Sequence, residues 1–90
     1  MNVERLIKAL NSATRRKIIL LLAQHDMSAS QVYKELKKNA PKYRQSVNKA
    51  LDLIEECKII EKYYDEKEKT IKHHLIKKEY KLILDKMEVE

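Results

Sequence analysis

The 90-residue chain contains no glycine and only one proline, Pro41. Glycine supplies the positive-φ positions of tight turns without steric cost, and proline interrupts helices, so a chain without them can be helical over most of its length. Any β-hairpin in this chain must turn without glycine. The lack of glycine also excludes the Gly-rich loops that hold phosphate groups in many enzymes.

Length and composition favour one small domain. With 43% apolar residues the chain can bury a single core, so we treat residues 1–90 as one domain. The longest unbroken apolar run covers six residues, 18–23, whereas a helix that crosses a membrane needs about 20. We recognise no secretory signal, and the single cysteine, Cys57, cannot form an intramolecular disulfide. We therefore expect a cytoplasmic protein that has no membrane partner.

Apolar residues recur at helical spacing in five segments. Helices are predicted over residues 2–10, 13–24, 29–38, from 41 or 42 to 57, and 79–88. Ser12 and Ser28 are good N-caps for the second and third of these helices, and Pro41 suits the first turn of the fourth. The predicted buried stripe of the fourth helix consists of Val47, Leu51 and Ile54, with Ala50 and Cys57.

Two segments before the last helix have the composition of strands. Residues 59–64 and 70–76 are rich in β-branched and aromatic residues, and five charged residues, 65–69, separate them. The chain is thus predicted to be mainly α (α+β), with four helices, a β-hairpin and a terminal helix. A helix, a short break, a second helix and a hairpin form a winged helix-turn-helix, whose second motif helix enters the DNA major groove.

The positive charge is concentrated on this predicted motif. The chain has a formal net charge of +6 and a pI near 9.4, which favours a polyanionic partner. Residues 34–49 contain six positive residues and one negative residue, a net charge of +5. Charge that served solubility alone would have no reason to collect there. We therefore predict that the chain binds double-stranded DNA.

The exposed residues of the fourth helix suit contacts in a DNA groove. Arg44 can donate two hydrogen bonds to guanine, and Gln45 or Asn48 can pair with adenine in the same way. The lysines suit phosphates, which fix the register without reading the sequence. Tyr43 can contact a phosphate or a thymine methyl group, or it can pack beneath the turn. The candidate DNA contacts are Ser28, Gln31, Lys37, Lys38, Lys42, Tyr43, Arg44, Gln45, Asn48, Lys49, Lys67 and Lys69.

The tip of the predicted hairpin is a weak phosphate-binding element. Residues 65–69 contain two positive and three negative residues, a net charge of −1. We therefore expect this tip to hold phosphates less strongly than a basic wing does. Lys67, Lys69 and Lys72 are its candidate backbone contacts.

Three segments carry a resemblance to a known family. Residues 10–18 read LNSATRRKI, residues 26–32 read DMSASQV, and residues 51–60 read LDLIEECKII. The first resembles the L-x-x-x-T-R-x-x-I opening of ArsR-like winged helix-turn-helix transcriptional regulators. The second is similar to their entry into the helix-turn-helix, and the third resembles their L-x-x-L-E-x-x-G-L-V end of the recognition helix. Together the matches cover about residues 6–64.

The resemblance implies a homodimer built from the first and last helices, at about residues 2–10 and 79–88. The apolar stripes of both helices supply suitable surfaces for holding two recognition helices one DNA turn apart. Lys58 stands where the family usually has glycine, and the turn within the motif also lacks glycine, so we expect both turns to be built differently. The candidate dimer residues are Val3, Leu6, Ile7, Leu10, Tyr80, Ile83, Leu84 and Met87.

The residues argue against a metal site or a cofactor. Metal-sensing members of the family carry paired cysteines in the first motif helix, or Asp and His in the terminal helix. This chain has Ser28 and Ser30 instead, and no histidine in residues 79–88. Successive strand residues point to opposite faces, so we expect one of His73 and His74 to be packed and the other solvated. We expect Cys57 to be a small buried hydrophobe, with redox sensing as the alternative.

We therefore predict a sequence-selective, DNA-binding transcriptional regulator that acts as a homodimer. A repressor and an activator both fit the sequence, and no small-molecule effector is evident from it. It is not expected to be an enzyme, because no nucleophile, base and orienting residue form a recognisable arrangement. A protein-interaction module that docks an acidic partner is the main alternative. RNA binding is a further alternative, although it usually relies on exposed aromatic residues, and the aromatic residues here are five tyrosines.

Overall fold

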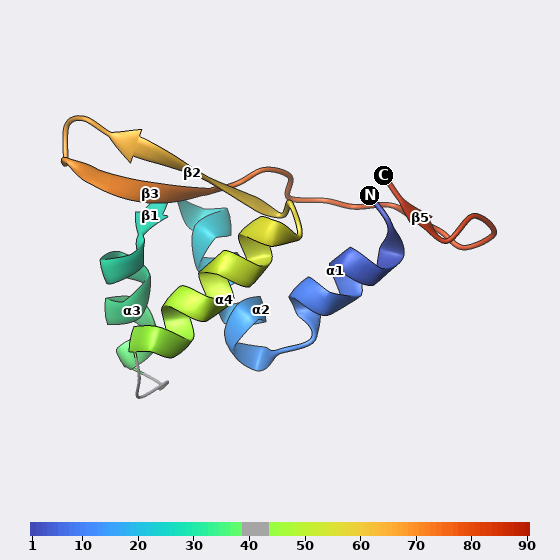
Figure 1. Cartoon of the computed structure of the whole chain (residues 1–90), viewed down its shortest axis with the longest axis horizontal. Coiled ribbons are helices and arrows are strands. Elements are labelled where there is room, and N and C mark those ends of the chain that lie inside the picture. The colour runs from blue at the N-terminus through green and yellow to red at the C-terminus, as the bar shows by residue number, and fades with distance from the viewer. Residues whose placement is uncertain (39–43) are drawn as a thin grey trace.

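The computed structural model describes residues 1–38 and 44–90. These residues form four helices and three short antiparallel strand pairings (Figure 1). The elements, in chain order, are α1 (Val3–Leu10), α2 (Ala13–Gln24), β1 (Met27–Ser28), α3 (Ala29–Lys37), α4 (Arg44–Glu56), β2 (Ile60–Asp65), β3 (Thr70–Leu75), β4 (Leu82–Ile83) and β5 (Glu88–Val89). The predicted α+β class, with four helices followed by a β-hairpin, is confirmed.

Side-chain caps set the starts of the first three helices. Asn2 caps α1, and Ser12 Oγ accepts a hydrogen bond from the backbone N–H of Arg15 (3.3 Å) at the start of α2. Ser28 Oγ accepts from the N–H of Gln31 (3.2 Å), and Gln31 Oε1 accepts from the N–H of Ser28 (2.8 Å), which completes a capping box. The predicted caps Ser12 and Ser28 are confirmed. The predicted start of the fourth helix, at residue 41 or 42, lies outside the described residues.

One core forms where α2, α3 and α4 meet the sheet. Ile18 of α2, Val32 of α3 and Ile54 of α4 are fully buried, and Ile59, just before β2, and Ile60 of β2 close the core. Each such side chain contributes about 1.5–3 kcal/mol when it leaves water. The predicted stripe of α4 is confirmed, since its members are all buried: Val47, Ala50, Leu51, Ile54 and Cys57.

Arginine side chains attach α1 to α2. The guanidinium of Arg15 donates to the carbonyl oxygens of Lys8 (2.8 Å), Ala9 (3.2 Å) and Asn11 (3.2 Å). The guanidinium of Arg16 donates to the carbonyl oxygen of Leu10 (2.6 Å). The last carbonyls of a helix lack partners within it, so cationic donors there satisfy them and favour the negative end of its dipole. The Thr-Arg segment of the sequence therefore has a structural role here.

A three-stranded antiparallel sheet in the order β1-β3-β2 covers one side of the helices (Figure 1). In β2 and β3, Ile60 lies opposite Leu75 and Asp65 lies opposite Thr70. The pair forms a wing that extends past the helices. Strand β1, whose Met27 lies opposite His73, was not predicted, because two residues are too few to show a periodic pattern.

Lysine residues adopt the left-handed backbone conformation that glycine usually supplies. Lys58 has a φ of 65°, and its N–H donates to the carbonyl of Glu55 (2.9 Å), while that of Ile59 donates to Ile54 (3.2 Å). These two bonds form a Schellman motif. The expectation that this turn is built differently is therefore wrong: a lysine makes the same turn. The turn between α3 and α4 lies mostly in residues 39–43, outside the described part.

The predicted terminal helix over residues 79–88 is also wrong. Residues 81–90 form a hairpin in which the backbones of Lys81 and Glu90 exchange hydrogen bonds of 2.8 and 2.9 Å. The N–H of Val89 donates to the carbonyl of Met1 (2.9 Å), and the Val89 side chain is buried against the rest of the chain. A ten-residue helix is only marginally stable in water, so these long-range bonds and the burial of Val89 favour the hairpin.

The two ends of the molecule are built from different parts of the chain (Figure 1). The wing, α3 and the start of α4 lie at one end. The start of α1, both chain termini and the β4–β5 hairpin lie at the other. Any function of the first end is thus separated in space from a function of the second.

Candidate nucleic-acid interface

The start of α4 exposes polar and basic side chains. Arg44, Gln45, Asn48 and Lys49 are all exposed, on the side of the helix away from the buried stripe. A helix has 3.6 residues per turn, so Gln45 and Asn48 lie one turn apart on one face. The candidates Lys42 and Tyr43 lie outside the described residues. The described candidates on α4 therefore share one accessible surface.

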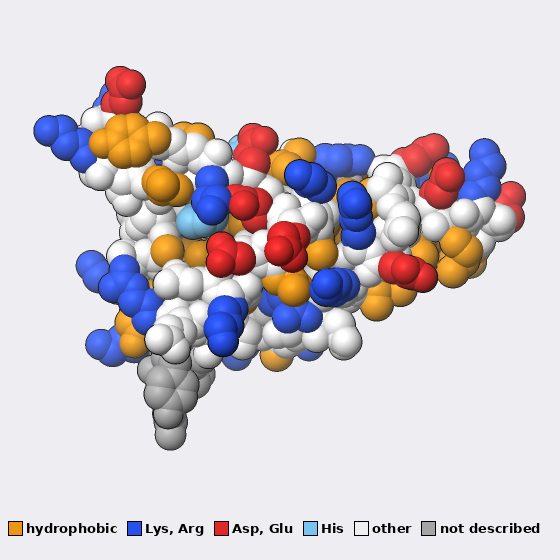
Figure 2. Space-filling model, in the orientation of Figure 1, with side chains coloured by type: hydrophobic (Ala, Val, Ile, Leu, Met, Phe, Trp, Pro, Cys, Tyr) orange, Lys and Arg blue, Asp and Glu red, His pale blue; other side chains and the backbone are white. Residues whose placement is uncertain are grey.

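The end of α3 adds further positive charge. Lys37 and Lys38 are exposed, and the ammonium of Lys38 lies 3.4 Å from the carboxylate of Glu35. Figure 2 shows Lys and Arg side chains at this end of the molecule. Two other candidates have a role in the fold: Ser28 is buried, and both Ser28 and Gln31 form the capping box.

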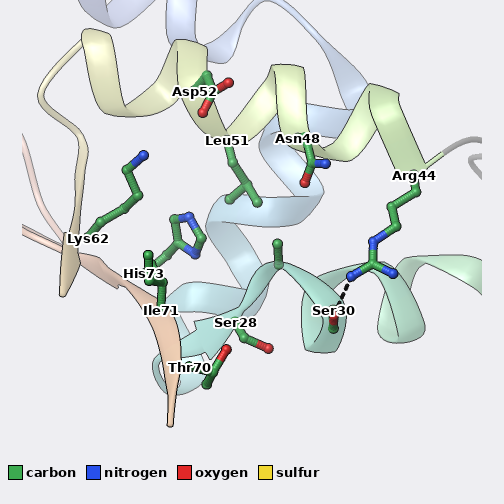
Figure 3. Close-up of a pocket in the computed structure, with 11 residues that line it drawn as sticks. Ser28, Ser30, Arg44, Asn48, Leu51, Asp52, Lys62, Thr70, Ile71 and His73 are labelled. Atoms are coloured by element: carbon green, nitrogen blue, oxygen red, sulfur yellow. Dashed lines mark hydrogen bonds between the residues drawn. The ribbon is translucent and has the colours of Figure 1, made fainter. Parts of the chain in front are cut away.

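An open groove of about 340 Å³ lies between α4, the start of α3 and the wing (Figure 3). Arg44 Nη2 donates a hydrogen bond to Ser30 Oγ across this groove. Sequence reasoning missed Ser30 as a site residue, although its position in the first turn of α3 was a usable signal. The groove is lined by Ser28, Ala29, Ser30, Arg44, Asn48, Leu51, Asp52, Lys62, Thr70, Ile71 and His73.

The wing neutralises one of its own cations. The ammonium of Lys72 lies 3.0 Å from the Glu68 carboxylate and 3.2 Å from the Asp65 carboxylate. The bond to Glu68, with help from Asp65, raises the pKa of Lys72 above its ordinary value. Lys67 and Lys69 are exposed in the turn. They remain the accessible cations of the wing tip, whereas Lys72 has a structural partner.

A polar cluster on the outer face of the sheet joins the wing to the loop before β1. Tyr63 Oη donates to Asp26 Oδ2 (2.6 Å), and His74 Nδ1 lies 2.8 Å from Asp26 Oδ1. Partial burial raises the pKa of the Asp26 carboxyl, but the bonds from Tyr63 and His74 outweigh it, so the pKa lies below its ordinary value. Sequence reasoning missed this cluster, because Asp26 is 37 residues from Tyr63.

The two adjacent histidines lie on opposite faces of the sheet, as predicted. His73 is buried and its Nδ1 lies 3.2 Å from the carbonyl oxygen of Met27, whereas His74 is exposed. Burial lowers the pKa of His73, so its neutral form is favoured, with Nδ1–H as the donor to Met27. Cys57 is buried and unbridged, which confirms its predicted place in the core.

Residues 1–38 and 44–90 contain no group of three His, Cys, Asp or Glu side chains arranged to hold a metal ion. Nor is any helix in these ranges long and apolar enough to cross a bilayer.

The opposite end of the molecule carries an apolar surface. Ile7, which is 58% exposed, and Leu10 are exposed on α1, and Leu84, which is 68% exposed, is exposed on the hairpin with Leu82 and Met87. A groove of about 330 Å³ separates α1 from Leu82. Of the other candidate dimer residues, Val3 is buried and three are half-buried, namely Leu6, Tyr80 and Ile83. We refer to Ile7, Leu10, Leu82, Leu84 and Met87 as the apolar end.

A solved structure has a similar arrangement of elements. An ArsR-like transcriptional regulator from Rhodococcus sp. RHA1 matches 82% of this chain, with a TM-score of 0.67 and 26% sequence identity. The chain covers 64% of the length of that protein. Neither the protein-family models nor the curated proteins give a match to the sequence. The chain has an ArsR-like winged helix-turn-helix fold.

Proposed function

We propose that this protein is a sequence-selective regulator of transcription that binds double-stranded DNA through α4. One observation carries the proposal: the exposed polar and basic face of α4 stands on a winged helix-turn-helix fold similar to that of an ArsR-like transcriptional regulator. In such folds the second helix of the motif occupies the major groove.

The residues of this face divide into two roles. Gln45 and Asn48 lie one turn apart, and an amide side chain can pair with the N6 and N7 edge of adenine. Lys37, Lys38 and Lys49 carry positive charge beside them and bind phosphates. Lys67 and Lys69 extend the phosphate contacts to the wing tip.

The regulator acts as a homodimer in this proposal. The apolar end is opposite the DNA-binding end, so two copies can join there and still present both α4 helices to one face of DNA. An isologous dimer of this kind matches an inverted repeat whose half-sites are about 34 Å apart. The protein would act in the cytoplasm as a repressor, without a metal ion.

Selection of bound duplexes from a random pool tests the proposal. We expect enrichment of an inverted repeat, and the binding constant should fall steeply with salt because several phosphates are neutralised. No enrichment, together with affinity that is undetectable at low ionic strength, would contradict DNA binding. Enrichment of a single, non-repeated site would contradict the dimer alone.

A further inference from the structure

Arg44 lies at the start of α4, but its guanidinium is turned toward α3. Its Nη2 atom donates to Ser30 Oγ, in the first turn of α3 (Figure 3). The side chain thus bridges the two helices of the motif across the groove. A guanidinium has five N–H donors in a fixed plane, so the bond to Ser30 orients the group and leaves donors for a ligand.

The surroundings of this guanidinium suit an anion. The hydroxyl groups of Ser30 and Thr70 and the amide of Asn48 line the same groove. The start of α3 adds the partial positive charge of a helix N-terminus. Asp52 is the acidic residue among the described lining residues, and it comes one helical turn beyond Asn48, farther from Arg44 along α4.

The other end of the groove has no excess of positive charge. Lys62 of the wing also lines the groove, but its ammonium lies 3.6 Å from the carboxylate of Glu55. Asp52 and His73 line the same part. The end formed by Arg44 and Ser30 is therefore where an anion is favoured.

We propose that this end of the groove binds one phosphate of the DNA backbone in each half-site. Arg44 holds that phosphate through two of its N–H donors, because planar forked donors match phosphate oxygens. It therefore positions the protein on DNA and does not read guanine, the role that its position in the sequence suggested. Base reading is left to Gln45 and Asn48. This inference rests on the proposed DNA-binding function.

A scan of neutral phosphates on the selected duplex tests the site. Methylphosphonate replaces one phosphate at a time, and the affinity of each duplex is measured for the full chain and for Arg44→Ala. For the unmodified chain, we expect that methylphosphonate at one position in each half-site lowers the affinity about tenfold. Because each subunit of the dimer loses its contact, Arg44→Ala should lose about 100-fold on the natural duplex and become insensitive to that substitution. Its binding constant should also depend less steeply on salt, by about 1.8 in the log–log slope, because two phosphate contacts are lost from the dimer.

Two matched variants separate phosphate binding from base reading. Gln45→Ala, on the exposed face of the same helix but outside the lining of the groove, should relax the base preference at one position and keep the sensitivity to methylphosphonate. Ser30→Ala should weaken binding less than Arg44→Ala does, without a change in base preference. Arg44 and Gln45 are exposed, and circular dichroism checks that each variant is folded.

The opposite pattern overturns the inference. If Arg44→Ala relaxes the preference at one base pair and stays fully sensitive to every methylphosphonate, Arg44 reads a base. In that case an operator has still been selected, so the proposed function stands. If the unmodified chain selects and binds no duplex, the proposed function fails, and the phosphate site fails with it.

Discussion

At the end of α4, Lys58 holds a backbone conformation that is unfavourable for any residue with a Cβ. Its φ is 65°, and the left-handed conformation costs about 1–2 kcal/mol in a non-glycine residue. Glycine removes this cost. Part of the resulting stabilisation is offset, because glycine has more conformational entropy in the unfolded chain. We expect Lys58→Gly to raise the free energy of unfolding by about 0.5–1 kcal/mol, measured by urea denaturation. Lys58→Ala keeps the strain, so an equal gain in that variant would contradict this explanation.

The buried His73 makes stability depend on pH. Burial holds its pKa below the ordinary value of 6.5, so the unfolded chain binds more protons than the folded chain as the pH falls below about 6.5. The contribution of His73 to the free energy of unfolding should therefore be fully present above that pH. It should decrease as the pH falls toward the lowered pKa of the folded state. Urea midpoints between pH 7 and 5 measure the decrease.

A glutamine at position 73 should remove this part of the pH dependence. Glutamine does not titrate, and its amide can donate a hydrogen bond to the carbonyl of Met27. The exposed His25 provides the control, since His25→Gln should keep the dependence of the unaltered chain. If the pH dependence disappears in His25→Gln and persists in His73→Gln, it comes from His25, and the explanation based on the burial of His73 is wrong.

At the scale of elements, local signals identified α2 and α4, and long-range bonds decided the C-terminal hairpin. Ser12 and the stripe of α4 act within a few residues, so their pattern is readable along the chain. Tyr80, Ile83, Leu84 and Met87 have helical spacing too, but Val89 pairs with Met1, 88 residues away. A periodic pattern contains no information about that partner. The same holds for the site, where the exposed face of α4 was predictable and the bond from Arg44 to Ser30 was not.

Val89 is the residue through which the hairpin attaches to the fold. It is only 4% exposed, so Val89→Ala removes buried methyl groups at a cost of about 1–2 kcal/mol. We expect faster hydrogen exchange at the backbone N–H groups of Lys81 and Glu90, which bond each other across the hairpin. Lys86→Ala, in the exposed turn of the same hairpin, should leave that exchange unchanged. Unaltered exchange in Val89→Ala would show that the hairpin does not depend on this side chain.

At the scale of the whole molecule, separate ends would allow the proposed DNA binding and the proposed self-association to be changed one at a time. Ile7 on α1 and Leu84 on the hairpin are the most exposed large side chains of the apolar end. Arg15 ties α1 to α2, so this surface is fixed relative to α4. The geometry of a dimer formed here would therefore set the spacing of the two α4 helices on DNA.

A charge placed at the apolar end should dissociate the dimer and leave each subunit folded. In Ile7→Glu, a dimer would bury an unpaired carboxylate, whereas the monomer leaves it in water. We expect light scattering after size exclusion to give a monomer for this variant. A monomer occupies only one half-site and loses the gain in affinity from bivalent binding. Affinity for an inverted repeat should therefore fall by at least about 100-fold. Affinity for a single half-site should stay the same, because α4 is unaltered.

The exposed Leu20 of α2 supplies the matched control for Ile7. It is 66% exposed, and it lies beside Leu36 of α3, outside the apolar end. Leu20→Glu should therefore remain dimeric and bind the inverted repeat with unchanged affinity. If Leu20→Glu is monomeric while Ile7→Glu is dimeric, the subunits meet through α2 and α3. The two α4 helices would then be held at a different spacing, and the distance between the half-sites of the selected repeat would differ from one DNA turn.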